Sequence, residues 1–158
     1  GHSMGALLVY LVAQRLVAAD LPLPAHIFVS GHRAPSVSQR LSWKHNLPKT
    51  EFIAMLQQLG GCPSEILQDA ALLNFFEPVL RADLQAAELY QYQASLPLPV
   101  PMTVMLGTQE QEVNYEEAAA WQQETIYPLV IKVFNGGHFF IFEQTRQIKQ
   151  VIVQTLAR

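Results

Sequence analysis

The sequence has little charge, a single cysteine and no long apolar run. Of its 158 residues 15% are charged and the net charge is −3, so it lacks the basic surplus that binds nucleic acid or an anionic membrane surface. The lone Cys62 excludes an internal disulfide and is typical of a reducing compartment, which predicts a cytoplasmic protein. Its apolar runs fall short of the ~18 residues that a membrane-spanning helix needs, so we expect no membrane association.

The sequence also lacks the residue spacing of a metal site. Its five histidines and one cysteine show no pair at a typical ligand spacing, and we expect neither a metal nor a bound cofactor. For four of the histidines, His2, His26, His32 and His45, we expect a hydrogen-bonded or exposed side chain rather than a catalytic one. The fifth, His138, follows a pair of glycines.

What the sequence does contain is an alternation of short apolar strands and helices. Half of its residues are hydrophobic, as in folded globular domains. Periodicity and turn residues predict strands over 26–30, 102–106 and 129–134, and helices over 7–19, 114–123 and 144–156. This alternation is typical of an α/β fold with a parallel sheet.

Residues 36–93 interrupt the alternation with helical patterns alone. An apolar stripe that includes Phe52, Leu56 and Leu59 predicts one helix, and two more are predicted around 66–76 and 79–87. Because this insertion follows the first strand at the edge where α/β proteins bind ligands, we expect it to form a helical lid.

The chain opens with a G-x-S-x-G motif, residues 1–5, directly before an apolar helix. In α/β-hydrolases this motif forms a strained turn between a strand and a helix, and the turn exposes the serine as a nucleophile. An expression remnant, Gly-Ser-His-Met, is the alternative for the first four residues. The order here is Gly-His-Ser-Met, and Gly5-Ala6 continues the motif. We therefore expect Ser3 to be a catalytic nucleophile.

The motif needs a strand before it, and three strands are too few to bury a helix as apolar as 7–19. We therefore expect residues 1–158 to be the C-terminal part of one α/β-hydrolase domain, with about 90 or more residues upstream. The isolated 158 residues should then be unstable or prone to aggregate, because the central sheet is exposed.

A serine nucleophile needs a base and an acid, which in this fold follow in the order Ser, Asp or Glu, His. The last aspartate is Asp83, so the acid after the second predicted strand has to be a glutamate. Glu110 lies closer to the strand end than Glu112 and is the first choice, with Glu112 as the alternative. His138, in the segment Gly136-Gly137-His138 after the last predicted strand, is the expected base.

The tetrahedral intermediate of acyl transfer also needs N–H donors for its oxyanion. The backbone N–H of Met4, which follows the nucleophile, is the first expected donor, and the second is expected on a loop upstream. Loss of one such donor typically costs about 10²–10³ in rate, so we expect the chain alone to be a poor catalyst.

Several segments resemble the type II thioesterases, stand-alone α/β-hydrolases that accompany nonribosomal peptide and polyketide synthases. The first six residues are similar to their nucleophile turn, and Ser30–Pro35 (SGHRAP) is similar to the family's SG-x-RAP segment. Further similar segments are Leu47-Pro48, residues 59–65 (LGGCPSE), residues 78–83 (PVLRAD) and residues 136–140 (GGHFF). They occur in family order over the whole chain.

The resemblance implies hydrolysis of acyl or aminoacyl thioesters from the phosphopantetheine arm of a carrier protein, with Ser3 taking up the acyl group and His138 moving the proton. The family usually has aspartate where this chain has Glu110. Roles for Arg33, Arg81 and Asp83 do not follow from the motifs. Two other functions stay open: a lipase, esterase or peptidase with the same triad, and a catalytically inactive module that docks carrier proteins.

Overall fold

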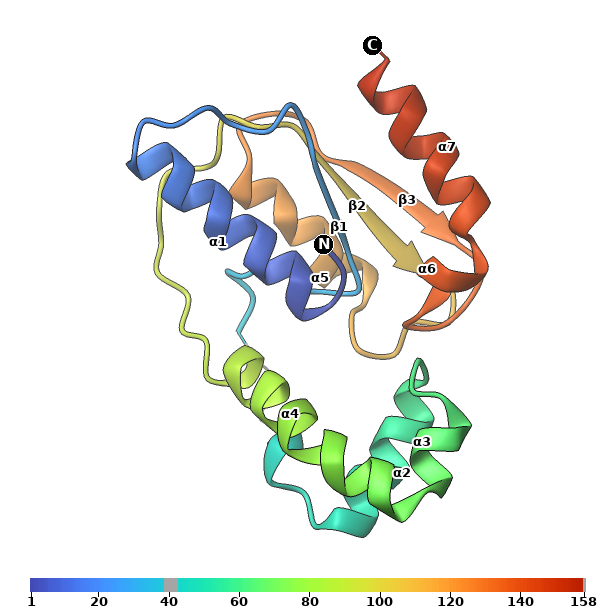
Figure 1. Cartoon of the computed structure of the whole chain (residues 1–158). Coiled ribbons are helices and arrows are strands. Elements are labelled where there is room, and N and C mark those ends of the chain that lie inside the picture. The colour runs from blue at the N-terminus through green and yellow to red at the C-terminus, as the bar shows by residue number, and fades with distance from the viewer. Residues whose placement is uncertain (39–42, 158) are drawn as a thin grey trace. The chain divides into compact units, whose positions relative to one another are not determined.

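The computed structural model describes residues 1–38 and 43–157. The chain divides into two compact units (Figure 1). The first, here called the α/β unit, comprises Gly1–Ser38 and Tyr92–Arg158, and the second, the helical unit, comprises Gln39–Gln91. The helical unit covers nearly the same stretch as the predicted insertion at 36–93, of which residues 39–42 lie outside the described part of the chain.

The α/β unit is built on a parallel sheet of three strands in the order β1-β2-β3. The strands are β1 (Ile27–Ser30), β2 (Met102–Gly107) and β3 (Val130–Phe134). Every residue of the central strand β2 is buried, which explains why its side chains are apolar apart from Thr103, since a parallel strand covered on both faces needs apolar side chains on both. The predicted α/β class and the three predicted strands are confirmed.

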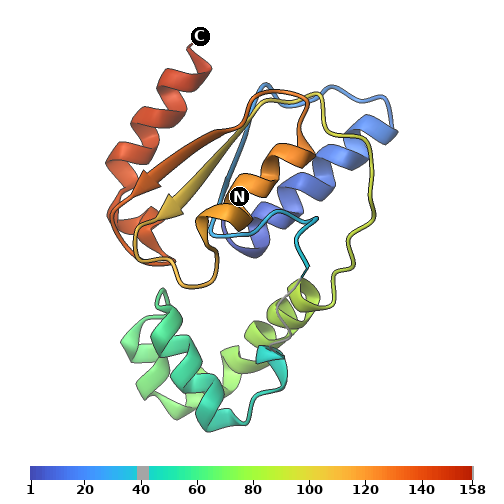
Figure 2. The same ribbon diagram turned by 180° about the vertical axis from the view of Figure 1, so that it is seen from behind.

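Helices cover both faces of the sheet (Figure 1, Figure 2). The first face packs against α1 (Met4–Ala18), α5 (Tyr115–Ala119) and the short 3₁₀ helix η2 (Ala120–Glu124), and the second against α6 (Phe140–Glu143) and α7 (Thr145–Leu156). Alternate residues of a strand point to opposite faces, so Val104 packs with the α1 side and Met105 with the α6–α7 side.

Three predicted helices differ from the structure in detail. The first begins at Met4 rather than at residue 7, because the turn that holds Ser3 leads directly into it. The predicted helix at 114–123 ends as an α-helix at Ala119 and continues as η2. The predicted helix at 144–156 is preceded by the separate short helix α6.

Helix α1 is fixed in the unit by its buried face. Tyr10 packs edge-on against Trp121, with 5.8 Å between ring centroids, and its hydroxyl donates a hydrogen bond to the carboxylate of Glu124. Both rings are fully buried. Since burial of an aromatic side chain contributes roughly 1.5–3 kcal/mol, these contacts hold the helix that carries the Ser3 turn at its start.

The helical unit contains η1 (Lys44–Asn46), α2 (Lys49–Leu59), α3 (Ser64–Gln68) and α4 (Ala70–Glu88). The predicted helices at 66–76 and 79–87 are wrong in one respect, because α4 runs without a break through Pro78. A proline inside a helix removes one hydrogen bond and is unfavourable, but side chains on both sides of it are held. Leu73 is buried before it, and Arg81 and Glu88 bind the η1 segment after it.

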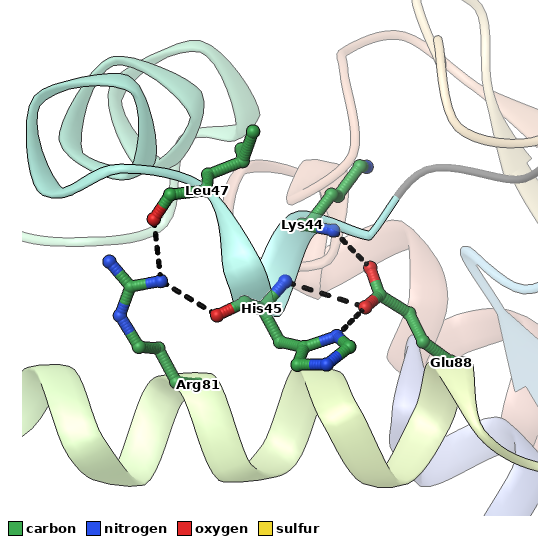
Figure 3. A network of polar contacts seen from close by, with 5 residues as sticks. All are labelled: Lys44, His45, Leu47, Arg81 and Glu88. Carbon is green, nitrogen blue, oxygen red and sulfur yellow. Dashed lines mark hydrogen bonds and ion pairs between the residues drawn. The ribbon is translucent and has the colours of Figure 1, made fainter.

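The η1 segment is attached to α4 by the polar network of Figure 3. Glu88 accepts hydrogen bonds from the backbone N–H groups of Lys44 and His45 and from Nδ1 of the His45 ring. Arg81 donates to the carbonyl oxygens of His45 and Leu47, at 2.7 and 2.8 Å. Two side chains of one helix therefore bind the two ends of a single 3₁₀ turn.

In the described part of the chain, no helix has both the length and the apolar character needed to cross a membrane.

Candidate active site

The predicted site residues lie at the edge of the sheet where the parallel strands have their carboxyl ends. The loop after β2 carries Glu110, and the loop after β3 carries His138. The turn at Ser3 is attached to the end of β1, because the Ser3 N–H donates to the carbonyl of Ser30 at 2.8 Å. This is the edge at which α/β proteins bind their ligands.

Ser3 has the backbone geometry of a strained turn. Its φ is 52° and its ψ is −125°, a region that residues other than glycine rarely adopt and that costs of order 1–3 kcal/mol. The residue stands directly before the first turn of α1 and makes no side-chain capping bond to that helix. Ser3 thus has the backbone expected of a nucleophile held between a strand and a helix.

Gly1 and His2 lie beside β1 as the end of a further parallel strand would. His2 forms a parallel bridge with Ser30, and the Ser30 N–H donates to the carbonyl of Gly1 at 3.0 Å. Gly1 and His2 therefore stand where the strand that the motif requires would end. A Cβ at Gly1 would lie 2.1 Å from the carbonyl oxygen of Gly5, so the tight turn requires glycine there.

The predicted oxyanion donor, Met4, is the first residue of α1. The first N–H groups of an α-helix have no partner within the helix. At this turn the N–H of Gly5 donates to the carbonyl of His2, and the N–H of Ala6 donates to the carbonyl of Ser3. The Met4 N–H follows Ser3 directly at the start of this helix, and its role as an oxyanion donor stays a prediction.

Glu110 and His138 form a direct hydrogen bond. His138 Nδ1 lies 2.9 Å from Glu110 Oε2, and both side chains are buried, with 5% and 1% of their surface exposed. Glu110 is thus the glutamate that reaches the histidine, and its other oxygen accepts from the N–H of Glu112 at 2.9 Å. The carboxylate binds Nδ1 of His138, and the role of Nε2 as the base stays a prediction.

The two loops that carry this pair are bonded to one another. Gln109 N–H donates to the carbonyl of Gly136 at 2.9 Å, and Thr108 N–H donates to that of Phe134 at 2.8 Å. Gly136, two residues before His138, has a φ of 128°, a backbone conformation that favours glycine. These bonds set the spacing of acid and base.

The electrostatics of the pair favour a charged carboxylate. Burial alone would raise the pKa of the Glu110 carboxyl, but the hydrogen bond and charge of His138 and the backbone N–H groups of Glu112 and Gln111 hold it below its ordinary value. A charged Glu110 stabilises the imidazolium that forms when His138 accepts a proton.

The ring of His2 connects the Ser3 turn to this pair. Its centroid lies 4.8 Å from that of His138 and 5.3 Å from that of Phe139. Burial, followed by the charge of His138, lowers the pKa of His2 to about 4 despite the opposing charge of Glu110. The structure therefore brings together the residue next to Ser3, the predicted base and the predicted acid, whereas a hydrogen bond between the Ser3 hydroxyl and His138 stays a prediction.

The histidines not expected to be catalytic all have partners. His2 Nδ1 meets Ser30 Oγ at 2.9 Å, His26 Nε2 meets Thr103 Oγ1 at 2.9 Å, His32 Nδ1 meets the Arg33 carbonyl at 2.6 Å and His45 binds Glu88. The sequence analysis missed the contact of His2 with His138. Its only signal was the position of His2 beside the nucleophile. Over residues 1–38 and 43–157, no three His, Cys, Asp or Glu side chains are grouped as a metal ion would require.

Comparisons with known proteins identify the family of this chain. The family model described as "Thioesterase domain" matches residues 1–156. The gramicidin S biosynthesis protein GrsT of Aneurinibacillus migulanus is 33% identical over 99% of this chain, and the thioesterase PikA5 of Streptomyces venezuelae is 34% identical over 94%. The type II thioesterase BorB from the borrelidin biosynthetic cluster superposes with a TM-score of 0.87 over 98% of this chain, at 33% identity.

The chain spans only part of these relatives. It covers 61% of GrsT, 52% of PikA5 and 62% of the BorB structure. Within that part, the match includes the Ser3 turn, the loop of Glu110 and the loop of His138, since it runs from the first residue to the last helix. The chain therefore belongs to the thioesterase domain family of the α/β-hydrolase fold.

Proposed function

We propose that this protein is a type II thioesterase that hydrolyses acyl or aminoacyl thioesters on the phosphopantetheine arm of carrier proteins. The observation that carries the proposal is the buried hydrogen bond between Glu110 and His138, beside a strained serine turn, in a chain similar to biosynthetic thioesterases such as BorB and PikA5. Carrier proteins of peptide or polyketide synthases are the proposed partners.

In the first step Ser3 Oγ attacks the thioester carbonyl carbon while His138 Nε2 accepts the hydroxyl proton. Glu110 holds Nδ1–H and stabilises the imidazolium. The Met4 N–H binds the oxyanion, together with a second donor outside this chain. The C–S bond then breaks, the leaving thiolate takes the proton from His138, and the acyl group stays on Ser3 as an ester.

In the second step a water molecule attacks the acyl-serine. His138 accepts one proton from the water and returns it to Ser3 Oγ as the ester bond breaks. The products are a carboxylic acid and the free serine, and the triad is restored without a metal or a redox cofactor. The helical unit is proposed to act as the lid that admits the phosphopantetheine arm, since it is a separate compact body inserted between β1 and β2.

The direct test compares the full-length protein on an acyl-carrier thioester and on a simple ester of the same acyl group. We expect a clear preference for the thioester, and we expect Ser3→Ala to abolish it. A preference for the ester would point to an esterase or lipase. Turnover that Ser3→Ala leaves unchanged would contradict the proposed nucleophile, and absence of turnover with both substrates would point to a docking module.

A further inference from the structure

The proposed mechanism gives no role to two residues close to His138 and to a third that bonds one of them. These are His2, Ser30 and Gly31, of which the last two open the SGHRAP segment singled out in the sequence. All three meet at the carboxyl end of β1, where Ser30 is the last strand residue and bridges to His2. Their contacts converge on the imidazole that has to move the proton.

The His2 ring is oriented by a hydroxyl group. Its Nδ1 lies 2.9 Å from Oγ of Ser30, and the ring lies close to the rings of His138, Phe139 and Phe140, at centroid distances of 4.8, 5.3 and 6.5 Å and in tilted or edge-on orientations. A ring held at one nitrogen and packed among three other rings has little rotational freedom. His2 therefore presents a fixed surface to His138.

Gly31 provides the room in which the two imidazoles meet. Its φ is 61°, and a Cβ on it would lie 2.7 Å from Cε1 of His2 and 3.0 Å from Cε1 of His138. Real Cβ atoms do not approach other atoms as closely as the first of these distances. Any side chain at this position would displace one ring or both, so glycine is needed here for space as well as for backbone conformation.

The choice of an imidazole at position 2 is not explained by packing alone. Nε2 of His2 is buried and has no hydrogen-bond partner among the residues that the structure describes, so the polar contact that an imidazole provides here is the bond of Nδ1 to Ser30 Oγ. Because its pKa is about 4, His2 is neutral at neutral pH. A neutral ring packs against His138 without opposing the positive charge that forms there during catalysis.

We propose that His2, Ser30 and Gly31 form a positioning platform for His138. Ser30 Oγ orients the His2 ring, Gly31 leaves space for it, and the ring packs against His138 and fixes the direction in which Nε2 faces Ser3. The role in turnover rests on the proposed function, because it concerns the same site. The platform itself is a statement about ring geometry, which is measured without substrate.

His26 offers a matched control. It also bonds a hydroxyl, Thr103 Oγ1 at 2.9 Å, and lies close to an aromatic ring, Phe28 at 4.4 Å, but it precedes the amino end of β1. His2→Asn and His26→Asn each keep a polar group that can bond the hydroxyl and each remove a ring. Of the two rings, the one at position 2 is the one that contacts His138.

The experiment uses these variants in the full-length protein with two readouts. The first is turnover of an acyl-carrier thioester, and the second is the downfield proton resonance of the His138 Nδ1–H bonded to Glu110. We expect His2→Asn to lower kcat by about 10- to 100-fold with little change in KM, since small misplacements of a catalytic group cost that much. It should also shift or broaden the resonance. His26→Asn should leave both readouts at the wild-type values.

Two further variants keep the test decisive if His2→Asn folds poorly. Ser30→Ala leaves the ring in place and removes only its orienting bond, so a smaller fall in kcat and a smaller shift of the resonance are expected. His2→Phe keeps the ring, so it should retain most of the activity that His2→Asn loses. A wild-type resonance and kcat in both His2→Asn and Ser30→Ala would overturn the platform. If Ser3→Ala leaves thioester turnover unchanged, the proposed function fails, and the resonance still decides on the platform.

Discussion

The part of the chain that the structure describes contains two histidine–glutamate pairs, one in each unit, and the two pairs have different surroundings. In both, Nδ1 of the histidine binds Oε2 of the glutamate, and both are largely buried. Glu110 and His138 lie on two loops at the carboxyl edge of a sheet, next to the Ser3 turn. Glu88 and His45 join a 3₁₀ turn to the side of a long helix (Figure 3).

A histidine–carboxylate bond is therefore not by itself a sign of catalysis. Glu88 also accepts two backbone N–H groups from the turn that carries His45, so its carboxylate serves the local fold. Glu110 also accepts backbone N–H groups, those of Glu112 and Gln111, but its pair lies at the sheet edge that holds the Ser3 turn. The neighbour of the imidazole decides its role.

The largest expected effect is on kcat, and it distinguishes the two histidines. In the full-length protein His138→Gln should lower kcat by on the order of 10⁶-fold, because removal of a triad base costs that much in serine hydrolases. His45→Gln should lower the melting temperature and leave kcat of the folded enzyme within a few-fold of the wild type. Steady-state kinetics and thermal melts measure both. A loss of activity in His45→Gln as large as in His138→Gln would remove the distinction.

The two glutamates should differ as the two histidines do, one affecting kcat and the other the stability of the fold. Glu110→Gln should lower kcat by about 10⁴-fold, because an amide no longer stabilises the imidazolium or its reacting tautomer. Glu88→Gln should instead cost about 1–3 kcal/mol of unfolding free energy, since it weakens charge-assisted bonds to Lys44 and His45. Denaturant titration and kinetics on the same preparations test this, and equal kcat losses in the two variants would contradict it.

Arg81 also stabilises the segment that carries His45 in the helical unit. It donates to the carbonyls of His45 and Leu47, pairs with Glu77 at 2.9 Å and lies 4.0 Å above the Phe52 ring. Arg81→Ala removes charged hydrogen bonds worth about 1.5–3 kcal/mol each in typical cases, and we expect a loss of about that size in total. Arg81→Lys should recover only part of it, because one ammonium group does not reproduce the planar fork. Full recovery in Arg81→Lys would mean that charge alone matters.

The smallest expected effect is on the pH dependence of folding stability. The pKa of Glu110 is lowered in the folded protein, so its pair with His138 stabilises the fold above the unfolded pKa of about 4.3 and this contribution is lost as pH falls through the folded value. Wild type should therefore lose stability more steeply than Glu110→Gln between about pH 5 and pH 3. Parallel stability curves for the two proteins would show that the pair contributes nothing to pH dependence.

Much of this arrangement was predictable from local sequence. The strands were found because apolar runs of strand length end in turn residues, and the order of Ser3, Glu110 and His138 was found because each follows a strand or precedes a helix. The continuous helix α4 was not found, because Pro78 breaks helices in most contexts and only tertiary bonds by Arg81 and Glu88 show why it does not here.

Contacts between distant side chains were the part that sequence did not provide. His45 and Glu88 lie 43 residues apart, and no periodicity joins a 3₁₀ turn to a particular helix position. The ring contact between His2 and His138 was missed for the same reason, although Gly31, which makes room for it, stands in a recognisable motif. The lid role of the helical unit stays a prediction.

The most direct test of the central claim is the rate at which a fluorophosphonate labels Ser3 in the full-length protein. We predict rapid labelling of Ser3 in the wild type and in His45→Gln, and labelling slowed by several orders of magnitude in His138→Gln. Equal labelling rates in all three proteins would show that the serine does not depend on this histidine, and the catalytic assignment would be wrong.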